Sequence, residues 1–207
     1  MLKKAISLSI CLALLGSSVI ASAETTNSIN NNESINLQDS QTPIGSTVVT
    51  GKTFTYENAP SKVKEEYEAN CNAINKIPKA NDEIFILARD FEKYGVNVQT
   101  RSVLDNYTLR YYNNGILTVS GSRNYSIDIN TTYVGYGYTT SGDAVHCLQI
   151  LLDVYAEDYG KPSVAVDGIF GTNTQNLLLT FQSAMGLSSD GIAGPNTWNT
   201  LVSVAFN

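Results

Sequence analysis

Histidine is nearly absent from this chain. Of 207 residues, only His146 is a histidine, and a Ser-His-Asp triad, a Cys-His pair or a two-histidine metal centre would each need it. We expect His146 to fall in a helix, where its neighbour Cys147 points about 100° away and cannot share its face. We therefore interpret His146 as a surface or boundary residue and predict no catalytic residues of these kinds.

Cysteine is also scarce, with Cys11 in the N-terminal apolar run and only Cys71 and Cys147 beyond it. Two cysteines and one histidine cannot form the usual four-ligand zinc site, so we predict neither a metal site nor another cofactor. Export would permit a disulfide between Cys71 and Cys147. A small buried thiol in an apolar helix is an equally ordinary explanation of Cys147, and the spacing leaves both readings open.

Positive charge is in deficit, because 13 basic residues face 19 acidic ones, for a net charge of -6. Removing an N-terminal segment that holds Lys3 and Lys4 would leave 11 basic residues and a net charge of -8. This balance disfavours nucleic acid as a partner. It also argues against long-range attraction to any anionic polymer, so binding to such a polymer should rest on short-range hydrogen bonds and apolar contacts.

The one long apolar run covers residues 5–20, directly after Lys3 and Lys4 and before the small residues 21–23. Residues 1–23 therefore match a secretory signal peptide. Sixteen residues are short for a membrane span, and the sequence offers no later candidate. We predict a secreted protein without a transmembrane segment.

Past the leader, residues 24–46 are rich in Asn, Ser, Thr and Gln and predict a flexible polar linker. Residues 47–138 predict a small α+β domain, in which we recognise no family. Its expected order is two helices, beginning at Ser61 and spanning residues 81–94, and then antiparallel hairpin strands at 108–112, 116–119 and 125–129. Asn114-Gly115 between the first two strands is a strong hairpin signal.

Two near-copies of one turn lie 23 residues apart, beginning at Asp167 and Asp190. Eight of twelve aligned positions are identical, and each Asp-Gly-Ile-x-Gly stretch leads into an apolar helical pattern. Such self-similarity indicates one supersecondary unit used twice. The simplest role of each aspartate is a turn carboxylate that accepts nearby backbone N–H groups.

Residues 139–204 resemble the three-helix peptidoglycan-binding domain of bacterial cell-wall hydrolases. The resemblance rests on both Asp-Gly turns together with Leu148-Gln149, Phe181-Gln182, Gly186-Leu187 and Thr197-Trp198. It implies an all-α three-helix domain over residues 139–207. The helical spacing of the large apolar side chains predicts Leu148, Phe181 and Trp198 in its core. The predicted fold is thus multidomain α+β, in which the α+β middle domain precedes the three-helix domain.

We predict a ligand-binding surface at the first turn, where exposed backbone N–H groups and a helix start would attract stem-peptide carboxylates. The second turn is the weaker candidate, because Ala193 replaces an aromatic residue and Pro195 removes a backbone donor. The residues of the predicted site are Asp167, Gly168, Phe170, Gly171 and Thr174.

Seven of the twelve tyrosines fall between Tyr107 and Tyr138. They could form a platform on which sugar rings stack. The alternative is that tyrosine packs well in half-buried strands, which needs no ligand.

The sequence thus predicts a secreted, cell wall-associated, non-enzymatic protein that binds peptidoglycan, through stem peptide or glycan, by its C-terminal domain. The middle domain would bind an unknown protein partner or serve a regulatory role. The alternative is a wall hydrolase whose catalytic carboxylates lie among the acidic residues of the middle domain, which include Glu66, Asp82 and Glu83. Those carboxylates are better explained as charged side chains on helix surfaces.

Overall fold

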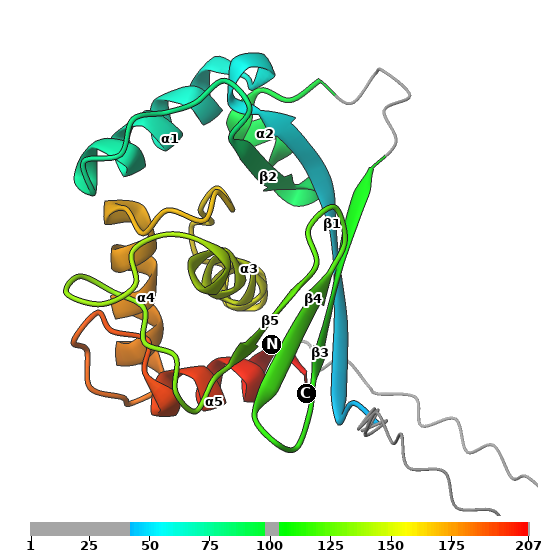
Figure 1. Cartoon of the computed structure of the whole chain (residues 1–207), viewed down its shortest axis with the longest axis vertical. Coiled ribbons are helices and arrows are strands. Elements are labelled where there is room, and N and C mark those ends of the chain that lie inside the picture. Colours follow the sequence, from blue (N-terminus) through cyan, green and yellow to red (C-terminus); the bar gives the residue numbers. More distant parts are fainter. Residues whose placement is uncertain (1–41, 98–103, 207) are drawn as a thin grey trace, which may run out of the picture. The chain divides into compact units, whose positions relative to one another are not determined.

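The structure, a computed structural model, describes residues 42–97 and 104–206. The predicted signal peptide lies outside these ranges. Within these two ranges, five strands and five α-helices follow one another along the chain, as the labels and colours of Figure 1 show. Their bounds are β1 (Gly45–Thr55), α1 (Ser61–Ala73), β2 (Glu83–Leu87), α2 (Phe91–Tyr94), β3 (Asp105–Tyr111), β4 (Ile116–Ser120), β5 (Tyr125–Asp128), α3 (Asp143–Asp158), α4 (Thr172–Ala184) and α5 (Pro195–Ala205).

The strands form one antiparallel sheet in the order β2-β1-β3-β4-β5. The long strand β1 pairs with β3 through its first half and with β2 through its second, and Gly51 has a partner on both sides. A Cβ at Gly51 would lie 2.2 Å from the carbonyl oxygen of Ile86 and 2.6 Å from the ring of Phe85. Only glycine therefore allows these strands to approach so closely.

The predicted fold class is wrong in its order of elements. A strand, β1, precedes the first helix, and β2 occupies residues 83–87, where we expected part of a helix over 81–94. The reason is burial, because the last four residues of β2 are all buried. A strand covered on both faces shows a continuous apolar run, whose periodicity does not distinguish it from a buried helix.

Other predicted elements are present. A helix begins at Ser61 and buries Val63, Tyr67 and Cys71. The hairpin turns at Gly115, whose φ of 85° suits glycine. Leu148, Phe181 and Trp198 are fully buried, as predicted.

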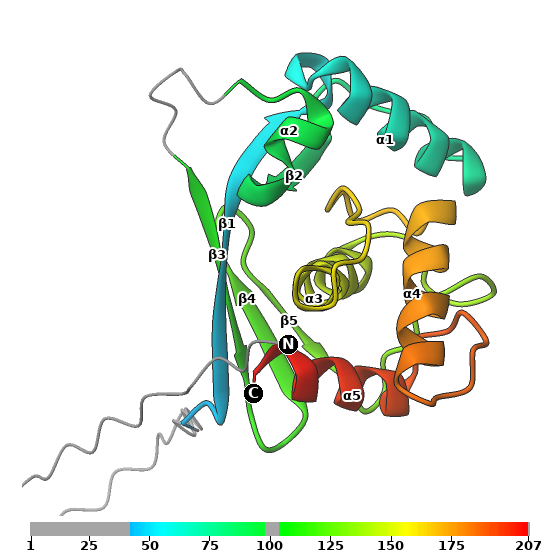
Figure 2. The ribbon, with the colours of Figure 1, turned by 180° about the vertical axis from the view of Figure 1, so that it is seen from behind.

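Helix α3 lies at the centre of the main hydrophobic core. Figure 2 shows it end-on between the sheet and α4, with α5 below it. One cluster of buried side chains joins the sheet to all three C-terminal helices, including Phe85 and Leu109 from strands and Leu148 from α3. A second cluster joins α1, β2 and α2 to Ile169.

His146 contradicts our interpretation of it as a surface or boundary residue. Its side chain is buried, its Nδ1 lies 2.7 Å from the Tyr125 hydroxyl, and its ring packs edge-on against Tyr107 and Tyr125. The sheet covers the face of α3 that would be exposed if three helices alone made the domain.

Cys71 and Cys147 are both buried free thiols. Within residues 42–97 and 104–206, no helix has the length and apolarity needed to cross a membrane.

Candidate functional site

A glutamine side chain from α3 holds the first Asp-Gly turn. The Gln149 Oε1 atom accepts the backbone N–H groups of Asp167 at 3.0 Å and Gly168 at 2.8 Å. Its Nε2 atom donates to the Asp167 carboxylate at 2.8 Å, and to the Ile169 carbonyl and the Thr174 hydroxyl, both at 3.1 Å. One buried amide therefore fixes both the turn and the first turn of α4.

Gln182 of α4 holds the second turn in the same way. Its Oε1 atom accepts Gly191 N–H at 2.9 Å, and its Nε2 atom donates to Asp190 at 2.9 Å, to the Ile192 carbonyl at 3.0 Å and to the Thr197 hydroxyl at 3.3 Å. In each turn the aspartate also accepts the N–H of the isoleucine two residues on, at 2.8 Å and 2.9 Å. The predicted role of the two turn carboxylates is confirmed.

The structure places most of the predicted ligand-binding residues in the interior. Phe170 and Thr174 are fully buried, and a Cβ at Gly171 would lie 1.9 Å from Oδ1 of Asn70. Of the five residues, Asp167 and Gly168 line the pocket described next. The helix start that faces this pocket belongs to α3, through Ser141 and Gly142, rather than to α4.

We call this cavity the first-turn pocket; it has a volume of about 430 Å³. It lies between the first turn and the loop that follows α1, and Arg123 from the connection between β4 and β5 completes it. Its lining includes both signs of charge. The residues are Tyr67, Lys76, Asn81, Asp82, Glu83, Arg123, Ser141, Gly142, Asp167, Gly168 and Ile169.

Lys76, Tyr67 and Asp82 form a linked group in the wall of this pocket. Lys76 Nζ donates to the Tyr67 hydroxyl at 2.7 Å, which donates to Asp82 at 2.6 Å, and the Lys76 ammonium lies 3.2 Å from the same carboxylate. Burial acts to raise the pKa of Asp82, but the hydrogen bonds from Tyr67, the Lys79 backbone and Lys76 together lower it. Asp82 is therefore ionised at neutral pH.

Arg123 and Glu83 supply the other charges of the pocket. The Arg123 guanidinium pairs with Asp143 at the start of α3. Glu83 is exposed. Sequence reasoning missed Lys76 and Arg123 as site residues, because only the folded chain brings positions so far apart in sequence to the first turn.

Asp167 lies behind the pocket surface and is almost wholly buried. Burial raises its pKa to about 6, although hydrogen bonds from Asn70, Gln149 and the Ile169 backbone oppose the rise. The carboxyl group thus changes charge in a mildly acidic range, next to the network that holds the turn.

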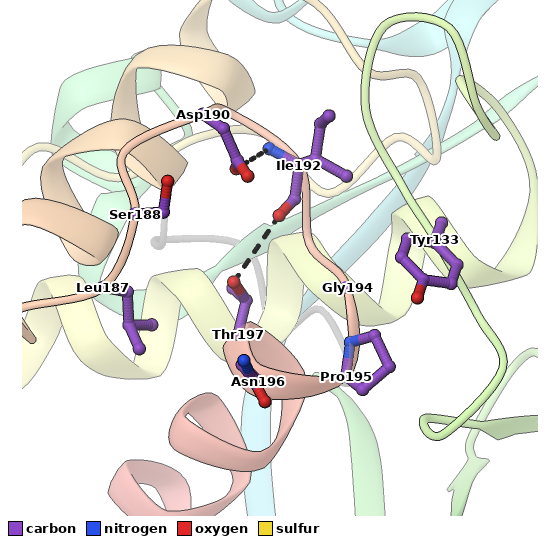
Figure 3. A pocket seen from close by; sticks show the side chains of 9 residues that line it. All are labelled: Tyr133, Leu187, Ser188, Asp190, Ile192, Gly194, Pro195, Asn196 and Thr197. Carbon is purple, nitrogen blue, oxygen red and sulfur yellow. Dashed lines mark hydrogen bonds between the residues drawn. The ribbon is translucent and has the colours of Figure 1, made fainter.

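The second turn borders a different cavity, which we call the second-turn pocket, of about 350 Å³. Figure 3 shows Tyr133 beside Gly194 and Pro195 at one side and Leu187 and Ser188 at the other. Asp190, the only charged residue of the lining, is exposed here, in contrast to its buried counterpart Asp167. The remaining lining residues are Ile192, Asn196 and Thr197.

Replacing either glutamine by leucine should destabilise the protein, and the loss should be larger at Gln149. Gln149→Leu leaves the buried backbone N–H groups of Asp167 and Gly168 without a partner, at roughly 1–3 kcal/mol each. It also removes one of the three hydrogen bonds that the buried Asp167 carboxylate accepts. The matched variant Gln182→Leu leaves only the backbone N–H of Gly191 without this partner, and Asp190, the aspartate of the second turn, is exposed. Urea denaturation measures both free energies of unfolding. Equal losses would contradict the ranking.

Asp167→Asn should reduce the pH dependence of stability. The folded pKa of about 6 exceeds that of an unfolded aspartate, roughly 4, so the folded chain holds this proton more tightly. The contribution is full below about pH 4 and is lost as the pH rises to about 6. Between pH 4 and 7, the free energy of unfolding of Asp167→Asn should therefore fall less than that of the wild type.

The difference should approach about 1.4 kcal/mol for each unit of pKa shift. Asp190→Asn is the matched control, because it makes the same change at the exposed copy. A profile of Asp167→Asn that parallels the wild type would show that this carboxyl group does not titrate as described.

Two family models match the chain. A putative peptidoglycan-binding domain matches residues 45–109, which include the segment in which the sequence alone revealed no family. A second model, a putative peptidoglycan binding domain, matches residues 141–201, in agreement with the resemblance described above. The first-turn pocket takes Tyr67, Lys76, Asp82 and Glu83 from the first range and Asp167 and Gly168 from the second.

Two solved structures are similar to the chain to very different degrees. A periplasmic domain of the EpsAB fusion protein of the Vibrio vulnificus type II secretion system is 15% identical over 53% of this chain and 55% of that one, and its TM-score of 0.29 is too low to indicate a common fold. A peptidoglycan-binding protein from Clostridioides difficile, solved in complex with glutamine hydroxamate, is 33% identical over 74% of this chain and 92% of that one, with a TM-score of 0.61. With both family models matched and this relative covered almost throughout, the chain belongs to the peptidoglycan-binding domain family.

Proposed function

We propose that this chain is an exported protein that binds peptidoglycan by its stem peptides and does not cleave it. The observation that carries the proposal is the position of the first-turn pocket. It lies where the two family-matched segments meet, and it combines Lys76 and Arg123 with Asp82 and Glu83. Two of the five residues predicted to bind ligand at the first turn, Asp167 and Gly168, line this pocket.

The charges of this pocket suit a ligand that carries both a carboxylate and an amine. A guanidinium can bind a carboxylate through two parallel hydrogen bonds, which fits Arg123 to the carboxylates of a stem peptide. The exposed Glu83 can accept an ammonium group. The Clostridioides difficile relative was solved with glutamine hydroxamate, an amino-acid derivative with groups of this kind.

Several buried groups support a non-enzymatic role. Burial lowers the pKa of His146 to about 3, so its ring is neutral at physiological pH and is enclosed by tyrosines. Burial raises the pKa of the Cys71 and Cys147 thiols, which disfavours a thiolate nucleophile. Glu66 accepts hydrogen bonds from Tyr94 and the Ala165 backbone, which gives it a structural function.

The proposal of export rests on the signal-like sequence of residues 1–23, and the proposal of wall association rests on the two peptidoglycan-binding family matches. We also propose that the polar segment ahead of the sheet is a spacer, which ends before residue 46 because Gly45 and Ser46 already belong to β1. A protein partner for residues 47–138 remains part of the proposal. No nucleic acid partner is proposed, given the net charge of -6.

Arg123→Gln should weaken binding to insoluble, purified cell walls by about tenfold or more, because it removes a charge-assisted hydrogen bond to the ligand. Glu83→Gln tests the ammonium side of the pocket. The matched controls Lys161→Gln and Glu92→Gln make the same charge changes at exposed positions outside the pocket. Sedimentation over a range of wall concentrations measures binding, and circular dichroism confirms folding. Undiminished binding by both pocket variants would refute the assignment of this pocket.

Purified protein should release no soluble fragments from the same walls. Chromatography of the supernatant after prolonged incubation measures release, with a known wall hydrolase as positive control. The competing function, a wall hydrolase, requires a carboxylate pair, and the pocket offers Asp82 and Glu83. Fragment release that disappears in both Asp82→Asn and Glu83→Gln would establish the hydrolase instead.

A further inference from the structure

A loop with three exposed tyrosines runs beside the second-turn pocket. Tyr133, Tyr136 and Tyr138 are 42%, 39% and 56% exposed, and they lie between β5 and α3. Packing in half-buried strands explains Tyr107, which is buried in β3, but not these three. Large side chains gathered at one exposed place indicate a binding surface.

The loop is held firmly against the second turn. Val134 and Ala193 exchange backbone hydrogen bonds of 3.1 Å and 2.8 Å, and the indole N–H of Trp198 donates to the Thr132 carbonyl at 3.0 Å. A Cβ on Gly135 would lie 2.7 Å from the carbonyl oxygen of Gly191. The tyrosines are therefore presented by a fixed backbone, so that a ligand need not order the loop.

Two of the rings form a single aromatic surface. Tyr133 and Tyr138 stack with their centroids 5.3 Å apart and their planes 24° apart. Tyr133 also lines the second-turn pocket and rests against the turn itself, because a Cβ on Gly194 would meet its ring at 2.8 Å. The aromatic surface and the pocket are thus continuous.

The polar groups of this pocket favour a neutral ligand. No lysine or arginine lines it, and its one charge is the Asp190 carboxylate, so an anionic ligand finds no cation there. Asp190, Asn196 and Ser188 are exposed oxygen- and amide-bearing side chains that can hydrogen-bond hydroxyl and acetamido groups. The volume of about 350 Å³ lies in the range of small-ligand sites.

We propose that the second-turn pocket binds an N-acetylated sugar of the wall glycan, with a sugar ring stacked on the Tyr133–Tyr138 surface. The C–H groups on a pyranose face are weakly positive and match the negative face of an aromatic ring. This proposal rests on the proposed function, peptidoglycan binding. It adds a glycan site to the peptide site at the first turn.

Both sites border one continuous segment of chain. Val134 pairs with Ala193 of the second turn, and Thr140 and Ser141 pair with the first turn at Phe170 and Ile169. The segment from Val134 to Ser141 therefore touches both turns.

The test uses two soluble probes and titration calorimetry with the full mature chain. The trimer of N-acetylglucosamine represents the glycan, and a stem tetrapeptide without sugar represents the peptide. Tyr138→Ala and Tyr133→Ala should bind the trimer roughly five- to tenfold more weakly than the wild type does, because the stacking surface is lost. Both should bind the tetrapeptide normally.

Tyr159→Ala is the matched control, since Tyr159 is 51% exposed at the end of α3 and does not line the pocket. Arg123→Gln separates the two proposals, because it should weaken tetrapeptide binding and leave trimer binding unchanged. A wild-type protein that binds the tetrapeptide but not the trimer would overturn the glycan site while sparing the peptide site. The glycan site would also be overturned if Tyr133→Ala and Tyr138→Ala both bound the trimer as tightly as the wild type does.

Discussion

The hydrogen bonds of two buried glutamines are the constraint on which the C-terminal half depends. Gln149 and Gln182 each use both ends of the amide, accepting backbone N–H from an Asp-Gly turn and donating to its carboxylate and to the next helix. A buried turn without such partners would leave polar groups unsatisfied. The amide therefore sets where each following helix starts, and with it the wall of each pocket.

Helix α3 connects this pair of turns to the rest of the molecule. It carries Gln149 toward the first turn and packs His146 against tyrosines of the sheet. Because the sheet covers α3, the core continues from the strands into the C-terminal helices. That core positions the connection that carries Arg123, and the second cluster, which joins α1 to Ile169, positions Lys76 near the first turn. The charged pocket therefore depends on both family-matched segments.

The two turns keep one hydrogen-bonding plan but differ in what surrounds them. Phe170 of the first turn is buried against the ring of Tyr136, while Ala193 at the same position of the second turn pairs closely with Val134. Asp167 is buried and Asp190 is exposed. The first copy of this supersecondary unit therefore borders the first-turn pocket, which carries both signs of charge. The second copy borders the second-turn pocket, which has an aromatic wall and a single charged residue.

The sequence by itself determined the features that arise from local chemistry. The Asp-Gly turns with their carboxylate bonds, the Asn114-Gly115 hairpin, the helix from Ser61 and the core positions of Phe181 and Trp198 all follow from spacing and turn residues. The tertiary structure decided the rest. It alone shows that the apolar run of β2 is a strand, that His146 and Phe170 are interior, and that Arg123 meets the first turn. These outcomes depend on which side chains the sheet and α3 bury. When a segment distant in sequence buries a side chain, the local pattern of apolar residues does not predict that burial.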